Sequence, residues 1–239
     1  MRRSHLHLVR KPLHNRSAAM TPRTLRTAQT ADGPSRIAKI LFNTMADAAM
    51  ELTHRSPWEL LVATILSAQC TDRRVNQVTP ALFAGYQTPL DIAQAKPAEL
   101  EALIKPTGFY KSKAKHLIGC GRMLSERFHG QVPATMEELT SLPGVGRKTA
   151  NVMLGTAFGQ PAVVVDTHVK RVANRLNLTR SDDPERIEQD LQRAFPQNQW
   201  TGLAQRLLLH GRYVCLARSP KCKGCALYDV CHWKGKQPR

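Results

Sequence analysis

The stretch that decides the fold is LTSLPGVGRKTANV, residues 139–152. Leu139 and Leu142 have helical spacing, a Pro-Gly-Val-Gly turn follows at residues 143–146, and a second helical segment begins at Arg147. Glycine permits backbone conformations with positive φ and lets another backbone approach closely. The pattern therefore predicts two helices joined by a tight hairpin.

The start of the second helix in this hairpin is a candidate anion site. Its free N–H groups and its positive dipole end face outward, which favours a phosphate. A hairpin of this kind grips DNA without reading its sequence. An ordinary helix connection is the alternative for a Pro-Gly-x-Gly segment alone, but Arg147 and Lys148 follow directly in a basic chain, which favours DNA contact.

Two side chains near the hairpin are candidates for chemistry. Lys148 lies in the first turn of the second helix beside Arg147, where the dipole and the neighbouring cation favour a reactive, unprotonated amine. From charge alone, a phosphate clamp explains Lys148 equally well. Asp166 follows the apolar run Val163–Val165, where it is either the N-cap of the next helix or a carboxylate that stabilises a cation or moves a proton.

The chain is strongly basic. Its 239 residues include 35 Lys and Arg against 18 Asp and Glu, a formal net charge of +17, and 42% of them are hydrophobic. Residues 1–36 and residues 206–239 each carry eight basic side chains and one acidic side chain, so the charge lies at the two ends. This distribution predicts an anionic partner, and nucleic acid explains it better than solubility alone. The longest apolar stretch, near residues 60–66, is too short to span a membrane.

Four of the six cysteines lie close together near the C-terminus. The spacing Cys215-x6-Cys222-x2-Cys225-x5-Cys231 supplies four thiolates in one short loop, which is a strong signal for a metal site in a reducing compartment. Zinc sites more often pair two Cys-x2-Cys units, so an iron–sulfur cluster and zinc are both alternatives here. Arg218 and Lys221 lie between the ligands, where a closed loop presents them to phosphate. Cys70 and Cys120 stand apart and are expected to be buried, inert thiols.

Apolar periodicity predicts an all-α fold. The expected helices lie near residues 37–48, 57–66, 75–82, 100–104 and 114–128, with a further helix after the capping box of Thr135 and Glu138. The helix at residues 57–66 is expected to begin with Ser56 as N-cap and Glu59 as the second member of a capping box. Val163–Val165 resembles a strand but has no partner with which to form a sheet. Residues 1–34, rich in Arg, Ser and Thr, are predicted to be a basic, disordered arm; a transit peptide, or a true start at Met20, are alternatives.

Three motifs, taken in order, resemble the endonuclease III family of helix-hairpin-helix DNA glycosylases. They are LPGVGRKTA at residues 142–150, VDTHV at residues 165–169, and the four-cysteine spacing. The resemblance covers about residues 35–233 and implies an all-helical, two-domain fold with a C-terminal iron–sulfur cluster loop. A helical-barrel domain with the hairpin is expected at residues 51–161, and a discontinuous cluster domain at residues 35–50 and 162–239.

The resemblance also implies an enzyme of base excision repair, namely a bifunctional DNA glycosylase and abasic-site lyase that removes oxidised pyrimidines. Lys148 is then the nucleophile that forms a Schiff base with the sugar of a flipped-out nucleotide, and Asp166 stabilises the developing cation. β-Elimination cuts the strand 3′ to the site. The implied cofactor is a [4Fe-4S] cluster, whose ligands are Cys215, Cys222, Cys225 and Cys231.

By the same resemblance, Gln69 fills the gap left by the flipped base, and Phe109 falls where the compared bacterial enzyme has a leucine wedge. For Gln69 alone, a hydrogen bond at a helix end is the simpler explanation. The expected DNA-binding residues are Gln69, Phe109, Gly144, Gly146, Arg147, Thr149, Arg218 and Lys221. The implied partner is double-stranded DNA with a damaged base or an abasic site. We expect a monomer without membrane contact in a bacterial cytoplasm, at the nucleoid, unless the arm directs it to an organelle.

Two other functions are alternatives. An adenine-specific mismatch glycosylase has a similar hairpin and cluster, but generally lacks the hairpin lysine and carries a further C-terminal domain. Here Lys148 is present, and the chain ends eight residues after Cys231. A non-enzymatic DNA-binding or redox-sensing iron–sulfur protein would use Lys148 and Asp166 merely as clamp and cap. Activity on a lesion-bearing duplex separates these functions.

Overall fold

The computed structural model describes residues 32–239, and residues 31–239 form one compact unit. The predicted arm at residues 1–34 lies outside the described residues except for its last three positions. These three already belong to the first helix, which begins at Asp32. The described chain therefore becomes helical slightly earlier than expected.

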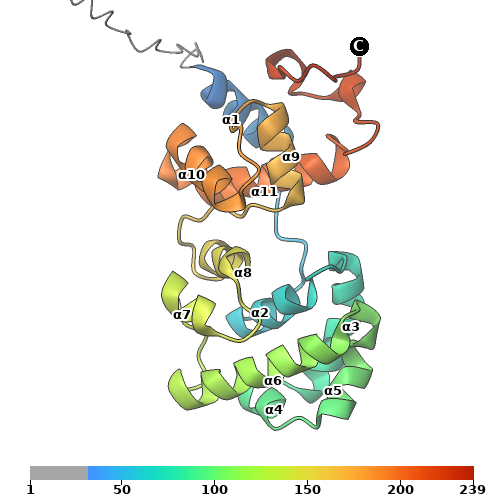
Figure 1. Ribbon diagram of the computed structural model, residues 1–239, viewed down its shortest axis with the longest axis vertical. Coiled ribbons are helices and arrows are strands. Elements are labelled where there is room, and N and C mark those ends of the chain that lie inside the picture. Colours follow the sequence, from blue (N-terminus) through green and yellow to red (C-terminus); the bar gives the residue numbers. More distant parts are fainter. Residues whose placement is uncertain (1–31) are drawn as a thin grey trace, which may run out of the picture. The chain divides into compact units, whose positions relative to one another are not determined.

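All the regular secondary structure of the described residues is helical and they contain no strand, which confirms the all-α class (Figure 1). The α-helices are α1 (Asp32–Thr44), α2 (Pro57–Leu66), α3 (Asp72–Gly85), α4 (Pro89–Ala93), α5 (Pro97–Ile104), α6 (Tyr110–Arg127), α7 (Met136–Ser141), α8 (Arg147–Val152), α9 (Thr167–Arg175), α10 (Pro184–Ala194) and α11 (Trp200–Tyr213). Shorter turns are η1 (Lys105–Thr107), the π-helical η2 (Met153–Ala157), η3 (Gln197–Gln199), η4 (Cys222–Gly224) and η5 (Tyr228–Val230).

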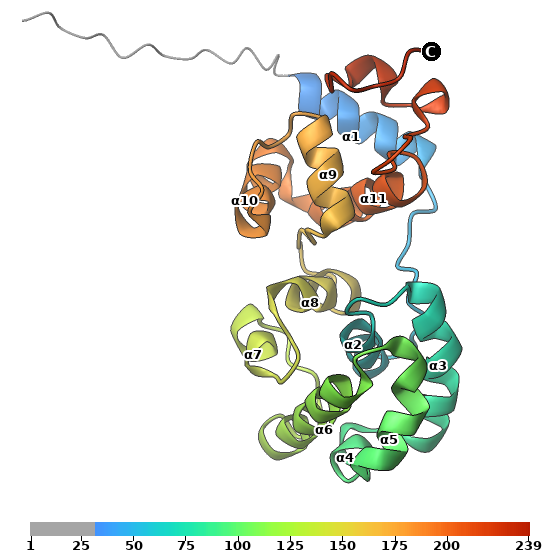
Figure 2. The same cartoon turned by 45° about the vertical axis from the view of Figure 1, so that its right-hand side comes forward.

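The helices gather around two hydrophobic clusters, which Figures 1 and 2 show as two groups of ribbons. The first cluster extends from Leu52 to Ala162 and is covered by α2–α8. The second combines Ile37–Leu41 of α1 with Val163–Val230, and α1 packs against α11. The N-terminal helix thus shares a core with the C-terminal helices. The division into two separate domains stays a prediction.

Helix α2 runs through the first cluster and is buried from Trp58 to Leu66. Ser56 begins it as predicted, because its hydroxyl accepts a hydrogen bond from the Glu59 N–H, at 3.2 Å. The Glu59 carboxylate does not return to Ser56. It accepts instead from the backbone N–H of Arg55 at 2.8 Å and from the Arg55 guanidinium, which holds the pKa of Glu59 below its usual value. The predicted capping box is therefore half formed.

Two side chains of α11 hold the segment that joins α1 to α2. Arg206 donates to the carbonyl of Ala46 at 3.1 Å, and Gln205 donates to the carbonyl of Ala49 at 2.7 Å. Arg206 also packs over the ring of Phe42. These contacts hold the segment between α1 and α2 against α11 before the chain enters the first cluster.

The two isolated cysteines differ. Cys120 is buried as expected, and burial raises its pKa to about 12. Cys70 is only partly buried, so the expectation of a buried thiol is wrong there, because the chain leaves the core at the end of α2.

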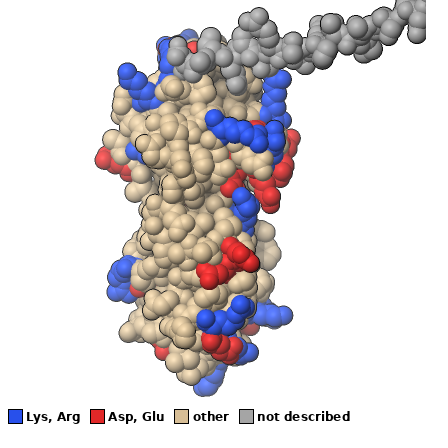
Figure 3. Space-filling view, turned by 90° about the vertical axis from the view of Figure 1, so that its left-hand side faces the viewer, with Lys and Arg blue, Asp and Glu red and all other residues tan. Residues whose placement is uncertain are grey.

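Charged side chains of both signs are scattered over the face in Figure 3, without one continuous basic patch on that face. This view agrees with the nearly balanced charge of the middle of the sequence. None of the described helices combines the length and the apolar character needed to cross a membrane.

Candidate active site

A pocket of about 160 Å³ opens where residues of the two hydrophobic clusters meet. Its walls come from α2, α8, η2, α11 and the segments that precede α2 and α9. Both candidates for chemistry, Lys148 and Asp166, line this pocket, and so does Thr149. The structure therefore brings together two residues that stand 18 positions apart in the sequence.

The hairpin that carries Lys148 needs a glycine at one of its two positions. Gly144 has a φ of +81°, and a Cβ atom there would lie 2.8 Å from the Cβ of His116 in α6. Gly146 has a φ of −96° and open space where its Cβ would be. The expectation of a positive φ thus holds for Gly144 alone. At Gly146, the lack of a side chain leaves the start of α8 accessible from outside.

Helix α8 begins without a side-chain cap at Gly146, so the first-turn N–H groups remain available to an external acceptor. Lys148 lies in this turn and is exposed. Within residues 32–239, no side chain forms a hydrogen bond or an ion pair with its amine. The amine is accessible and borders the pocket.

Asp166 is the N-cap of α9, as its position predicted. One oxygen, Oδ1, accepts from the backbone N–H groups of His168 and Val169, both at 2.8 Å. Among the described residues, no donor is bonded to the other oxygen, Oδ2. Asp166 can therefore cap α9 through Oδ1 and still offer Oδ2 to a cation or a proton in the pocket.

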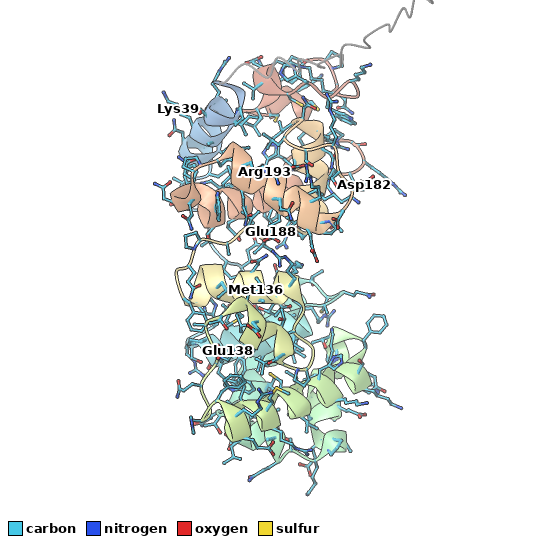
Figure 4. The ribbon with its side chains drawn as sticks, turned by 60° about the vertical axis from the view of Figure 1, so that its left-hand side comes forward. Lys39, Met136, Glu138, Asp182, Glu188 and Arg193 are labelled. Carbon is cyan, nitrogen blue, oxygen red and sulfur yellow. The ribbon has the colours of Figure 1, made fainter. Side chains whose placement is uncertain are left out.

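Arg147 lies next to Lys148 but is held differently. Its Nε and Nη2 atoms donate to the two carboxylate oxygens of Glu188 in α10, at 3.0 and 2.9 Å. Glu188 is buried, and Asn151 of α8 donates to the same carboxylate at 3.1 Å. Figure 4 shows Glu188 at the lower edge of its group of helices, beside α8. These contacts of Arg147 and Asn151 with Glu188, called the clasp below, join the hairpin to the second cluster, and no sequence pattern indicates them.

Gln69, the predicted gap-filling residue, and Phe109, the predicted wedge, lie in the turns that follow α2 and precede α6. Gln69 has a φ of 54° and Phe109 a φ of 49°, both in the left-handed region that only glycine adopts without strain. Both side chains are exposed, Phe109 at 64%. An exposed aromatic ring on a strained turn is unusual for a structural residue and is typical of a functional one.

The four clustered cysteines, Cys215, Cys222, Cys225 and Cys231, line one small pocket whose other walls are mostly apolar. Arg175 of α9 donates to the Sγ of Cys215 at 3.2 Å, and its guanidinium stacks on the ring of Trp233 at 3.9 Å. His210 lies 3.7 Å from the Sγ of Cys225. Within residues 32–239, no three His, Cys, Asp or Glu side chains are placed to hold a single metal ion.

Comparison with known proteins decides the family. A family profile described as "HhH-GPD superfamily base excision DNA repair protein" matches residues 62–197. The chain belongs to this superfamily. It is 51% identical over 196 residues to endonuclease III of Synechocystis sp., covering 82% of this chain and 90% of that protein. To endonuclease III of Escherichia coli K12 it is 43% identical over 186 residues, covering 78% and 88%.

Solved structures of the endonuclease III family match this fold. A non-covalent endonuclease III–DNA complex superimposes with a TM-score of 0.82 at 44% identity, covering 85% of this chain and 95% of that one. A trapped endonuclease III–DNA covalent intermediate gives 0.82 at 43% identity, covering 85% and 96%. The chain is thus a DNA glycosylase of the endonuclease III family. The expected family, helix-hairpin-helix fold and enzyme class are confirmed.

In this endonuclease III relative, the lining of the pocket also includes a group of charged side chains. Arg212 of α11 forms ion pairs with Glu51 and with Asp72, the latter at 2.6 Å, and Tyr213 donates to the Glu51 carboxylate. Three of these residues, Arg212, Glu51 and Asp72, line the pocket with Lys148 and Asp166. Sequence patterns did not single them out, because they come from three separate segments.

The remaining predicted DNA-binding residues lie on the surface of this glycosylase. Arg218 and Lys221 are exposed in the cysteine loop. Neither side chain has a hydrogen-bond or ion-pair partner within the described part of the chain. Their contacts with DNA stay predictions, as do those of Gln69, Phe109 and the hairpin residues.

Proposed function

We propose that this protein is a bifunctional DNA glycosylase and abasic-site lyase that removes oxidised pyrimidines from duplex DNA and cuts the strand 3′ to the site. The observation that carries the proposal is the shared pocket, which is lined both by Lys148, whose amine is accessible, and by Asp166, whose Oδ2 has no donor among the described residues. A glycosylase without a lyase step needs only an activated water. A covalent step needs an amine at the pocket, and Lys148 supplies it.

The described surface supports binding of duplex DNA around this pocket. The uncapped start of α8 offers backbone N–H groups to a phosphate, and Gly146 leaves room for the phosphate to approach. Gln69 and Phe109 enter the base stack when the damaged nucleotide is flipped into the pocket. Arg147 contributes to DNA binding mainly by holding the hairpin in place through Glu188, because two of its N–H donors are directed to that carboxylate.

In the proposed reaction, the neutral amine of Lys148 attacks C1′ of the flipped nucleotide. The bond between C1′ and the base breaks, and the base leaves with its electron pair and takes up a proton. Oδ2 of Asp166 stabilises the positive charge that develops on the sugar, while Oδ1 keeps the carboxylate in place. Ring opening gives an iminium at C1′. Loss of a proton from C2′ then expels the 3′-phosphate, and water releases the amine.

The cysteine loop fits a [4Fe-4S] cluster, because four thiols border one largely apolar pocket. Cys215, Cys222, Cys225 and Cys231 would hold such a cluster, which would close the loop and present Arg218 and Lys221 on a fixed surface. We expect the loop to contribute to the binding of phosphate and not to the chemistry, because none of its cysteines lines the pocket that contains Lys148.

The proposed partner is duplex DNA with a damaged base or an abasic site. The relatives compared above are bacterial, which supports a place at the nucleoid of a bacterial cell. A monomer is sufficient, because all proposed catalytic residues come from one chain.

Borohydride trapping tests the proposal. The purified protein is incubated with duplexes that contain thymine glycol, 8-oxoguanine, an abasic site or no damage, and borohydride is added. We expect a covalent protein–DNA product with thymine glycol and with the abasic site, because reduction fixes the Schiff base. Base release without a trapped product would overturn the lyase step. Trapping that prefers 8-oxoguanine would overturn the proposed substrate class.

A further inference from the structure

A buried lysine lies outside the active-site pocket. Lys113 of α6 is only 4% exposed. Its Nζ donates to the carbonyl of Leu66 at 2.7 Å and to the carbonyl of Thr107 at 2.8 Å. No carboxylate pairs with it among the described residues. A buried cation is costly unless hydrogen bonds compensate it, so these two carbonyls are what keeps this ammonium in place.

Each of the two carbonyls lies at the end of a helix, just before a residue predicted to contact DNA. Leu66 ends α2 three residues before Gln69, and Thr107 ends η1 two residues before Phe109. Lys113 itself follows Phe109 by four positions in the first turn of α6. One ammonium thus bridges the two backbone segments that carry Gln69 and Phe109. The segments are 40 residues apart in the sequence.

The chemistry of the bridge suits its position. Carbonyls at the C-terminal ends of helices carry partial negative charge and lack intrahelical partners, so a cation satisfies them well. A bond to each segment also restrains the left-handed turns at Gln69 and Phe109, which are otherwise free to relax toward unstrained conformations. Burial lowers the pKa of Lys113, so the two carbonyl acceptors are needed to favour the protonated amine.

We propose that Lys113 is a positioning residue that holds Gln69 and Phe109 at a fixed separation, so that both side chains enter the DNA stack as one unit. The proposal rests on the insertion of these two residues, which is part of the proposed function. It makes the amine of Lys113 a structural link between two DNA contacts and not a contact itself.

Three variants test the link. Lys113→Met keeps the length and the apolar stem but removes the ammonium, whereas Lys113→Arg keeps a cation that can still donate to both carbonyls. Lys115→Met is the matched control, because Lys115 is an exposed lysine of the same helix and its loss removes the same charge. The readout is the fluorescence of 2-aminopurine placed opposite a tetrahydrofuran abasic-site analogue, which rises when inserted side chains unstack it. Phe109→Ala gives the reference level of fluorescence that is expected when no aromatic side chain is inserted.

We expect Lys113→Met to reduce the fluorescence rise to the level of Phe109→Ala, at a protein concentration that saturates the duplex. Lys115→Met should keep the full rise, and Lys113→Arg should restore part of it. Thermal unfolding is measured for each variant. If Lys113→Met is folded and gives the full rise, the proposal is wrong.

A mutant cycle tests the link without relying on one variant. Dissociation constants for the same duplex are measured for Gln69→Ala, Phe109→Ala and the double variant, each with Lys113 and with Lys113→Arg or Lys113→Met. We expect the two losses to be coupled about five-fold or more in the presence of Lys113, and to become nearly independent with Lys113→Met. Independent losses in the presence of Lys113 would overturn the proposal, even if Lys113→Met fails to fold.

These outcomes are distinct from failure of the proposed function. That failure would appear as no trapping by the unaltered protein on any duplex. Failure of the Lys113 proposal would leave trapping intact and only remove the coupling between Gln69 and Phe109.

Discussion

The hairpin at residues 139–152 and the cysteine loop at residues 215–231 both carry candidate functional residues, but different forces hold them. In the hairpin, Leu139, Leu142 and Val145 are buried in the first cluster, and Gly144 is packed against α6. The cysteine loop contains two single turns, η4 and η5, and contributes Leu227 and Val230 to the second cluster. The hairpin is thus ordered by the packing of two helices, whereas the loop has no helix longer than a single turn, and we propose that a cluster bound by its thiols completes its order.

The largest effect is expected from Cys222→Ser. Metal-binding energies on the order of 10 kcal/mol are coupled to folding at such sites, so the variant should lose its iron, and residues 215–231 should become sensitive to protease while the hairpin stays protected. Iron and sulfide analysis and limited proteolysis measure this. Cys70→Ser, outside the loop, is the control that keeps its iron. Stoichiometric zinc without iron in the unaltered protein would refute the cluster.

The second prediction concerns chemistry in the hairpin. Lys148→Gln should remain folded, retain its cluster and bind abasic DNA, yet lose trapping by about 10³-fold or more, because the amine is gone. Binding persists, since backbone N–H groups hold the phosphates. Asp166→Asn should keep the cap of α9 and trap on a preformed abasic site, while base removal becomes slow. Efficient trapping by Lys148→Gln would show that another amine is the nucleophile.

The third prediction contrasts the two hairpin glycines. Gly144→Ala should lower the free energy of unfolding by about 1–3 kcal/mol, because the added methyl group is forced into a left-handed conformation against His116. Gly146→Ala has neither strain nor clash, so its unfolding temperature should match the unaltered protein, while its affinity for DNA falls. Thermal unfolding and DNA titration separate the two. Equal stability of the two variants would contradict ordering of the hairpin by packing.

The smallest effect is expected from Glu188→Gln. It removes the charge that pairs with Arg147 but retains a hydrogen-bonding group, and the half-exposed arginine can turn to solvent. We expect a loss of about 1–2 kcal/mol in stability, with faster amide exchange at the start of α8. Asp182→Asn, at an exposed carboxylate that pairs with Lys170, is the control. A stability loss no larger than the control's would mean that the clasp is unimportant.

The sequence predicted what is local. The N-cap at Ser56, the hairpin turn and the cap at Asp166 depend on neighbours within four positions, and patterns of that length are visible in a chain. Helix α4 was missed although Thr88 and Asp91 form its capping box, because five residues are too few to show a helical period.

What the sequence could not predict are the contacts between distant segments. The partner of Arg147 lies 41 positions away, and Lys113 meets one of its carbonyls across 47 positions. Neither of these polar contacts produces a periodic pattern in the sequence. For that reason the sequence did not predict the ion pair of Arg147, and no sequence pattern singled out Lys113.

The shared core of α1 and α11 has a consequence for synthesis of the chain. Helix α1 leaves the ribosome before residues 52–162, whereas α9, α10 and α11 appear only after the whole first cluster has been made. The apolar face of α1 therefore waits without its partners while residues 52–162 are already able to collapse. A nascent chain that stops before α11 leaves this face uncovered, and chaperones that bind exposed apolar helices are expected to recognise it there.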